Sequence, residues 1–407
     1  MKKVIILQNS DLSFGLDASK LVNTKKYQLY LFINKFSFDI LTQQNQEKYY
    51  TEIFITDDFS FHNISTKITS LLQGYNDFNV VTNSEETMPI CGEIRQFFGL
   101  DSEDYSRFYD KHIMKKRLSK LDHINLPKYE LFDHIKFTSR GELYLKNLIS
   151  KMSFPLFIKP TCMYGALQTA KINSYEELRQ WAESVKVDTQ YEIDEFIDGT
   201  MYHCDSYIKN GKVLFTFVSQ NSRPCYDFTI GKMKGTIVLP KEHPDSILLS
   251  NIAEKTLNAL GIPKGGVTHL EVIKTKENKI YFIEMAHRSP GCLIPKMYSV
   301  HAGVDTISSH ILLQIDPNFS PKPNRKIFSA WACYPKIPGI VAQLDTLPNH
   351  IKSKYEINWN IKVGDVIKTY SLMGRDYTGT IFMTNHLFEE LYQEFMEINN
   401  LNLCEIT

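Results

Sequence analysis

The stretch LEVIKTKENKIYFIE, which runs from Leu270 to Glu284, decides the fold of this chain. Strand-forming residues flank a polar centre, and this predicts a β-hairpin that turns at Glu277 and Asn278, because asparagine tolerates the positive φ of tight hairpin turns. Counting outward from that turn places Glu271 directly opposite Glu284. Like charges that face each other destabilise a sheet, so the pair needs a reason.

A bound cation supplies that reason. Ile273, Ile280 and Phe282 alternate with the glutamates in a way that places them on the same face, so we expect that face to be partly buried. A buried carboxylate pair requires a proton or a cation between its members. Oxygen ligands favour Mg²⁺ or Mn²⁺, and Mg²⁺ leaves several positions to water and nucleotide phosphates. The alternative is a pair of solvated glutamates whose side chains splay apart.

The composition narrows the class of protein. The chain has 407 residues, and its 46 Lys and Arg balance its 46 Asp and Glu, which argues against a chain-wide surface for nucleic acid or an anionic membrane. No apolar stretch approaches membrane-spanning length, and the first apolar run is too short for a signal peptide. The 7 cysteines form no CxxC pair, so neither a zinc site nor a disulfide framework is expected. We expect a cytoplasmic protein.

Strand and helix patterns divide the chain into four expected units. Residues 1–105 alternate β-rich runs with helical connections, which predicts an α/β domain with a mostly parallel sheet. Residues 106–188 and 189–320 predict an α+β core of two subdomains with antiparallel sheets, and YEIDEFIDG is expected in the same sheet as the glutamate hairpin. Residues 321–407 are expected to form a separate small β-rich lobe.

Three basic residues stand where a phosphate-bearing ligand needs cations. Lys159 ends the apolar strand FPLFIKP just before a proline, which keeps its backbone extended. Lys111 begins the helix in YDKHIMKKRL, where an anion also meets the positive end of a helix. Arg288 follows the second glutamate strand, and a guanidinium grips phosphoryl or carboxylate groups in a bidentate way. Taken singly, each is more often a solvated residue or the partner of a loop carbonyl.

The order of these segments resembles that of the ATP-grasp ligases. Between about Val4 and Asp316 the chain carries SEETMPICGEIRQFFGL, YDKHIMKKRL, FPLFIKP, YEIDEFIDG, THLEV and FIEMAHRSPG, which look like the successive signatures of ATP-dependent carboxylate-amine ligases. The C-terminal GDVIKTYSLMGRDYTGTI is similar to the corresponding part of the L-amino acid ligases. The resemblance implies ATP and Mg²⁺ or Mn²⁺ as cofactors and amino acids as small-molecule substrates.

The resemblance also implies roles for individual residues. Glu271 and Glu284 would hold the metal, and Arg288 would stabilise the γ-phosphoryl group. The backbone of the hinge would pair with adenine, and the loop TCMYGALQT would cover the phosphates. The residues implied for ATP binding are Lys111, Lys159, Gly165, Glu195, Phe196 and Ile197.

The chain departs from the family pattern at several positions. Met201 stands where the family often has a ribose-binding glutamate, and Ala286 replaces a metal-binding asparagine. The covering loop keeps Gly165 as its one glycine, and Cys292, which we expect to be structural, follows Gly291 where a second glycine is expected.

The acceptor site is expected near a variable insertion. The segment SQNSRPCYDFTIGKMKG resembles the insertion that contacts the amino acid in L-amino acid ligases, and Asp227 within it suits an ammonium or guanidinium group. His203 and Asp205 alternate on one strand and are candidates to face the cleft, as is Gly291 after the metal strand. The alternatives are a solvated loop and hydrogen-bonded core residues.

The resemblance implies an ADP-forming ligase that joins two L-amino acids into a dipeptide through an acyl phosphate. Two alternatives stay open: another ATP-grasp ligase with a purine-pathway or bicarbonate-type substrate, and a nucleotide-binding regulatory protein with a degenerate site. Met201 and Ala286 favour the regulatory alternative, whereas the retained glutamates and basic residues oppose it.

Overall fold

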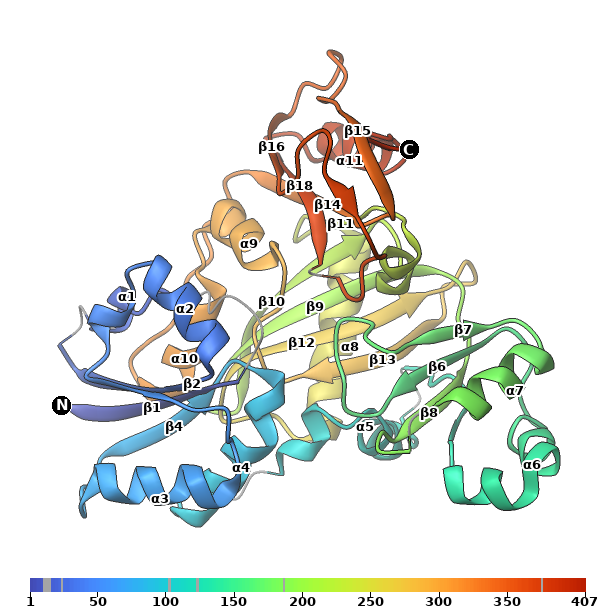
Figure 1. Cartoon of the computed structure of the whole chain (residues 1–407). Coiled ribbons are helices and arrows are strands. Elements are labelled where there is room, and N and C mark those ends of the chain that lie inside the picture. Colours follow the sequence, from blue (N-terminus) through green and yellow to red (C-terminus); the bar gives the residue numbers. More distant parts are fainter. Residues whose placement is uncertain (10–15, 23–24, 102–103, 122–123, 186, 375) are drawn as a thin grey trace.

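The computed structural model describes residues 1–9, 16–22, 25–101, 104–121, 124–185, 187–374 and 376–407. These residues form four sheets, and the largest lies centrally, between an N-terminal α/β layer and a small sheet at the opposite side (Figure 1). Within the described part of the chain, no helix has the length and apolar character needed to cross a membrane.

The N-terminal layer is a parallel sheet covered on both faces, as its buried apolar strands predict. Its strands pair in the order β3-β2-β1-β4. Apolar side chains of α3 and α4 pack on one face, and those of α1, α2 and α10 pack on the other. The bounds are β1 Lys2–Gln8, β2 Tyr27–Ile33, β3 Glu52–Ile55, β4 Phe78–Thr82, α1 Ser19–Val22, α2 Lys35–Gln43, α3 Phe61–Leu72, α4 Met88–Phe97 and α10 Thr306–Ile315.

The small sheet is antiparallel, in the order β5-β8-β6-β7. Alternate apolar residues of its strands pack against α6 and α7, so the charged residues between them face the other way, toward α5. Its elements are β5 Tyr129–Leu131, β6 Leu156–Pro160, β7 Ala170–Ile172, β8 Tyr191–Glu195, α5 Lys111–Leu118, α6 His134–Leu148 and α7 Tyr175–Ser184. The prediction that YEIDEFIDG belongs to the glutamate sheet is wrong, because β8 pairs with β5 and β6 instead.

The central sheet runs β13-β12-β9-β10-β11-β14-β18-β16. One face packs on α8, α5 and α11, while part of the other face is covered by α9. The bounds are β9 Thr200–Lys209, β10 Lys212–Asn221, β11 Lys234–Val238, β12 Gly265–Lys274, β13 Ile280–Ala286, β14 Phe328–Pro335, β16 Lys354–Trp359, β18 Tyr377–Asn385, α8 Pro244–Leu260, α9 Ile294–Ala302 and α11 Phe388–Ile398.

The C-terminal residues are rich in strands, as the sequence predicts, but they do not stand apart. Three of their strands, β14, β16 and β18, continue the central sheet through pairing of β11 with β14. A further three-stranded sheet consists of β15 Gly339–Leu344, β17 Val366–Ile367 and β19 Cys404–Ile406. The expectation of a separate lobe is therefore wrong, because backbone pairing joins it to the core.

The glutamate hairpin has the predicted central pair but a different turn. Glu271 lies opposite Glu284, whereas Lys274 lies opposite Ile280, so the two halves of the hairpin differ in register by one residue. The Asn278 N–H donates to the Thr275 carbonyl at 3.0 Å, and Asn278 has a φ of 60°, which defines a three-residue loop. A β-bulge between the two halves then restores the glutamate pair.

The bulge also corrects the predicted faces of the hairpin. Phe282 lies opposite Val272, and both are fully buried in the core behind the sheet, together with Ile280. Ile283 replaces them beside Ile273 on the glutamate face, because a bulge places an extra residue in one strand.

Candidate active site

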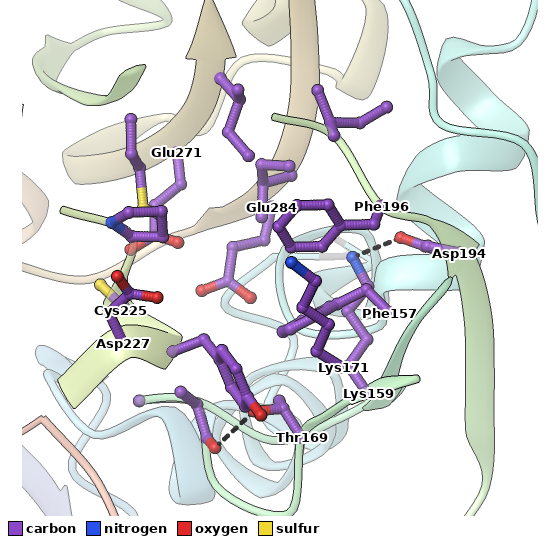
Figure 2. A pocket seen from close by; sticks show the side chains of 18 of the residues that line it. Phe157, Lys159, Thr169, Lys171, Asp194, Phe196, Cys225, Asp227, Glu271 and Glu284 are labelled. Carbon is purple, nitrogen blue, oxygen red and sulfur yellow. Dashed lines mark hydrogen bonds and ion pairs between the residues drawn. The ribbon is translucent and has the colours of Figure 1, made fainter. Parts of the chain in front are cut away.

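A pocket between the small and central sheets gathers most of the predicted site residues (Figure 2). The strands of the small sheet form one wall, and the glutamate hairpin forms the other. The predicted residues that line it are Lys111, Lys159, Gly165, Glu195, Phe196, Ile197, Asp227, Glu271 and Glu284.

The two glutamates present their carboxylates to this pocket from neighbouring strands (Figure 2). Their side chains are 17% and 13% exposed, so they are largely withdrawn from bulk water. Burial raises the pKa of Glu271, but the hydrogen bond and positive charge of His269 outweigh it, and the pKa lies below its ordinary value. Two mostly buried carboxylate groups side by side form an oxygen donor set that fits Mg²⁺ or Mn²⁺.

The predicted lysines face these carboxylates from α5 and β6. The Lys111 ammonium lies 2.9 Å from a Glu284 oxygen and also donates to the Met163 carbonyl of the covering loop. The Lys159 ammonium lies 2.8 Å from Asp194. Burial lowers the pKa of Lys159, yet the charges of Asp194 and Glu192 raise it above its ordinary value, so the cation persists in the pocket wall.

A buried ion network supports Lys159, and the sequence analysis missed it. Lys115, one helical turn after Lys111, is fully buried and lies 2.6 Å from both Glu192 and Asp194. The charges of Lys115 and Lys159 outweigh burial and hold the pKa of Asp194 below its ordinary value. The signal was available: Glu192 and Asp194 alternate with apolar residues in YEIDEF, which places both acids on one strand face.

Lys171 of β7 is a second missed cation of the pocket. Its ammonium lies 3.9 Å from the centre of the Phe196 ring, on the side of the pocket that carries the hinge (Figure 2). Among the residues that the structure describes, no carboxylate forms an ion pair with Lys171, so this cation over an aromatic ring adds positive charge to the pocket.

The hinge backbone has fewer free groups than the resemblance implies. The Glu195 N–H donates to the Lys128 carbonyl at 2.8 Å, and the Phe196 N–H donates to the Pro155 carbonyl at 3.1 Å. Within the described residues, no acceptor binds the Ile197 N–H. The Ile197 N–H is therefore the hinge donor that a purine base can still reach.

Arg288 lies beside the pocket and is tied to the N-terminal layer. Its Nε lies 2.7 Å from Glu85, and its Nη1 donates to the Ser289 carbonyl at 3.0 Å. Asn83 accepts hydrogen bonds from Ser289 at 2.9 and 2.8 Å, which fixes the same loop. The charges of Glu284 and Glu271 act on the buried guanidinium, so Arg288 belongs to the electrostatic surroundings of the glutamate pair although it does not line the pocket.

His203 and Asp205 do not line the pocket, contrary to the expectation that they face the cleft. They are 2% and 0% exposed, and Asp205 accepts from His203 and His269 at 2.7 Å each and from Tyr298 of α9. The charge of Asp205 overcomes burial and raises the pKa of His269 to about 9. The other His269 nitrogen lies 3.5 Å from a Glu271 oxygen, so this buried cluster holds a positively charged partner next to the Glu271 carboxylate.

The remaining substrate candidates occupy different positions. Asp227 lines the pocket from the 3₁₀ helix Cys225–Ile230 and lies 3.3 Å from Lys232. Gly291 is exposed, and a Cβ there would meet nothing within 4 Å, so no close approach requires glycine at this position. Cys292 is also exposed, and its thiol donates to the Gly374 carbonyl at 3.5 Å.

Known protein families and proteins resemble this chain. The ATP-grasp domain family matches residues 152–296, which include Lys159, the hinge and the glutamate pair. The L-arginine-specific L-amino acid ligase of Bacillus subtilis is 22% identical over 285 residues. This match covers 67% of this chain and 66% of the relative, so the chain spans just under two thirds of that relative's length.

Solved structures share the whole fold. The L-amino acid ligase from Bacillus licheniformis superposes with a TM-score of 0.71 at 16% identity, covering 100% of this chain and 98% of that one. Phosphoribosylglycinamide synthetase from Anaerococcus prevotii gives 0.61 at 18% identity, with 100% of both chains covered. Residues 152–296 therefore match the ATP-grasp domain family, as the sequence motifs predict, and the whole chain has a fold similar to that of the L-amino acid ligase from Bacillus licheniformis.

Proposed function

We propose that the chain is an ATP-dependent, ADP-forming ligase that joins two L-amino acids into a dipeptide. The observation that carries this proposal is the paired Glu271 and Glu284 in one pocket with Lys111 and Lys159. Carboxylates alone would repel a nucleoside triphosphate, and lysines alone would not hold a divalent metal. Their combination suits a metal–nucleotide complex.

Each group has a place in this scheme. ATP would lie along the pocket, with adenine near the Ile197 N–H and the phosphates near Lys111, Lys159 and Lys171. Glu271 and Glu284 would hold the metal, which supplies positive charge that bridges phosphate oxygens during phosphoryl transfer. On binding ATP, Lys111 would exchange part of its contact with Glu284 for phosphate oxygens.

The reaction has two balanced steps. A carboxylate oxygen of the first amino acid attacks the γ-phosphorus of ATP, and the bond between this phosphorus and the oxygen that bridges it to the β-phosphate breaks. ADP is released, and the first amino acid becomes an acyl phosphate. The nitrogen of the second amino acid attacks the acyl carbon, loses a proton and expels inorganic phosphate, which leaves an amide. Lys111, Lys159 and the nearby Arg288 offset the charge that develops in the first step, so positioning and electrostatics dominate catalysis.

The choice of amino acids rests on the similarity to L-amino acid ligases in sequence and in fold. A second candidate is a purine-pathway ligase, which is favoured by the similar fold of phosphoribosylglycinamide synthetase. The regulatory alternative is less well supported, because the pocket still has both carboxylates that suit a metal, Glu271 and Glu284, and both lysines that suit nucleotide phosphates, Lys111 and Lys159.

Phosphate release tests the proposal. The protein is incubated with ATP, Mg²⁺ and each amino acid singly and in pairs, and products are identified by mass spectrometry. Release that depends on a pair and yields a dipeptide supports the proposal. Release with phosphoribosylamine and glycine, or with bicarbonate, indicates the second candidate, and ATP binding without any release indicates a regulatory protein.

A further inference from the structure

A buried lysine lies next to the pocket and is used by none of these steps. Lys234 begins β11 and is 9% exposed. It lies on the same face of its strand as Thr236, which is opposite Asn221, and Val238, which is opposite Ser219. Ser219 lies opposite His203, and His203 lies opposite Glu271, so Lys234 shares the sheet face of the glutamate pair. The groups whose negative charge would act on the Lys234 ammonium include the Glu271 carboxylate and, if it were ionised, the Cys225 thiol. Lys234 thus lies near Cys225, which lines the pocket, although Lys234 itself does not line it.

The Lys234 ammonium has no counterion within the described part of the chain. The ammonium lies over the Phe228 ring, 5.4 Å from its centroid. The other three lysines with buried side chains at this site, Lys111, Lys115 and Lys159, each lie within 3 Å of a carboxylate. A buried ammonium without a carboxylate costs several kcal/mol of stability, so a structural role does not explain Lys234.

The neighbouring thiols cannot neutralise it. Burial raises the pKa of Cys225 to about 12, and burial also raises the pKa of Cys333, the residue opposite Lys234 in β14, above its ordinary value. Both thiols are therefore uncharged near neutral pH. The positive charge is left for a group that the protein itself does not supply.

Two neighbours of Lys234 connect it with the pocket and its covering loop. Cys225 lines the pocket, and Gly374, whose N–H donates to the Gly165 carbonyl of the covering loop at 3.3 Å, packs against the ammonium. A Cβ at position 374 would lie 2.2 Å from the Lys234 Nζ, so glycine there leaves the room that the lysine needs.

We propose that Lys234 binds a substrate carboxylate that is not activated, so that the amine-bearing substrate of this enzyme carries a free carboxylate. This inference rests on the proposed ligase function and narrows its substrate class. The carboxylate has two possible sources, the α-carboxylate of the amine-bearing amino acid or an acidic side chain, and both offer the same chemistry to an ammonium group.

The test compares wild type, Lys234→Met, Lys234→Arg and the control Lys212→Met, which changes an exposed lysine at the far end of β10. KM is measured for L-alanine, L-alaninamide, L-glutamate and L-glutamine as amine substrates. A charge-assisted contact predicts that Lys234→Met raises KM for substrates with a free carboxylate about 10- to 100-fold and leaves L-alaninamide unchanged, with partial rescue by arginine. An increase for alanine identifies the α-carboxylate, and an increase for glutamate alone identifies a side chain.

Stability separates binding from a structural role. Because removal of an unpaired buried charge is favourable, Lys234→Met should keep or raise the melting temperature. Gly374→Ala, which displaces the ammonium while keeping its charge, should raise the same KM values. Equal effects of Lys234→Met on the acid and amide substrates, or a lowered melting temperature without a KM change, would overturn the proposal.

Direct binding keeps the inference independent of turnover. If no amino acid pair releases phosphate, the ligase proposal fails, and binding of glutamate, succinate and phosphate to wild type and Lys234→Met is measured by calorimetry. Binding of at least one anion to wild type, weakened about 10-fold or more in the variant, supports an anion site. Equal binding by both proteins, or binding by neither, refutes it.

Discussion

At the scale of single residues, the pocket is controlled by how each charge is paired. Glu284 contacts Lys111 at 2.9 Å on one side and faces Glu271, its partner in the proposed metal site, on the other. Replacing Glu284 by glutamine keeps the shape and removes the charge. Because even indirect partners of metal ligands change affinity about 10- to 100-fold, we expect at least a 100-fold loss of ATP-dependent phosphate release, rising partly with added Mg²⁺ or Mn²⁺.

The matched control for Glu284→Gln is Glu356→Gln, which removes an exposed carboxylate of β16 that pairs with Lys296. Both variants should unfold near the wild-type temperature. Phosphate release by Glu284→Gln within a few-fold of the control would remove Glu284 from the metal site.

At the same scale, the sequence predicted the glutamate pair for partly wrong reasons. The two-residue turn was wrong by one residue, and the bulge at Ile283 shifted the register back by one. Nothing in the run Ile280–Glu284 distinguishes a bulge, because Ile, Phe and Ile suit either face of a sheet that is buried on both sides. Lys115 was missed because the second of the three lysines in KHIMKKRL looks like part of a solvated helix face until the partner strand is known.

At the scale of elements, the hinge between β8 and β9 lies tightly against the glutamate hairpin. A Cβ at Gly199 would lie 2.4 Å from the Lys274 carbonyl oxygen of β12 and 2.8 Å from an Ile273 side-chain carbon. Gly199→Ala must therefore separate the hinge from β12. We expect a loss of about 1–3 kcal/mol in the free energy of unfolding and a raised KM for ATP.

Chemical denaturation checks the Gly199→Ala prediction. Gly291→Ala is the control for stability, because its added methyl group meets open space and should change the free energy of unfolding by less than about 0.5 kcal/mol. Equal stabilities for the two variants would show that the hinge and β12 do not need this contact.

Element identities followed from local patterns, whereas sheet membership did not. The strand β6, the two glutamate strands β12 and β13 and the helix α5 were predicted because the alternation of strands and the spacing of helices are local signals. The partners of β8 and the continuation of the sheet from β11 into β14 depend on contacts between residues far apart in sequence. Periodicity carries no information about such partners, so these assignments failed.

At the scale of the whole molecule, a neutral histidine joins the N-terminal layer to the central sheet. His310 of α10 accepts from the Val267 N–H at 3.0 Å and donates to the Thr82 carbonyl at 2.9 Å, so both ring nitrogens are used only when the ring is uncharged. Complete burial lowers its pKa from 6.5 to about 4. Arg288, held by Glu85 and the Asn83 loop, depends on the same junction.

This junction predicts loss of stability in mild acid. Below about pH 6.5 the unfolded chain binds a proton at His310, whereas the folded chain does so only near pH 4, so lowering the pH through this window favours unfolding. At about 1.4 kcal/mol for each pKa unit, His310 contributes about 3 kcal/mol to the decrease.

His310→Gln should be less stable than wild type at pH 7, and its free energy of unfolding should fall by about 3 kcal/mol less than that of wild type between pH 6.5 and 4. Denaturation at several pH values measures both slopes, with His62→Gln, at an exposed histidine, as the control that keeps the wild-type slope. A His310→Gln slope equal to that of wild type would mean that the ring is not held neutral between the two domains.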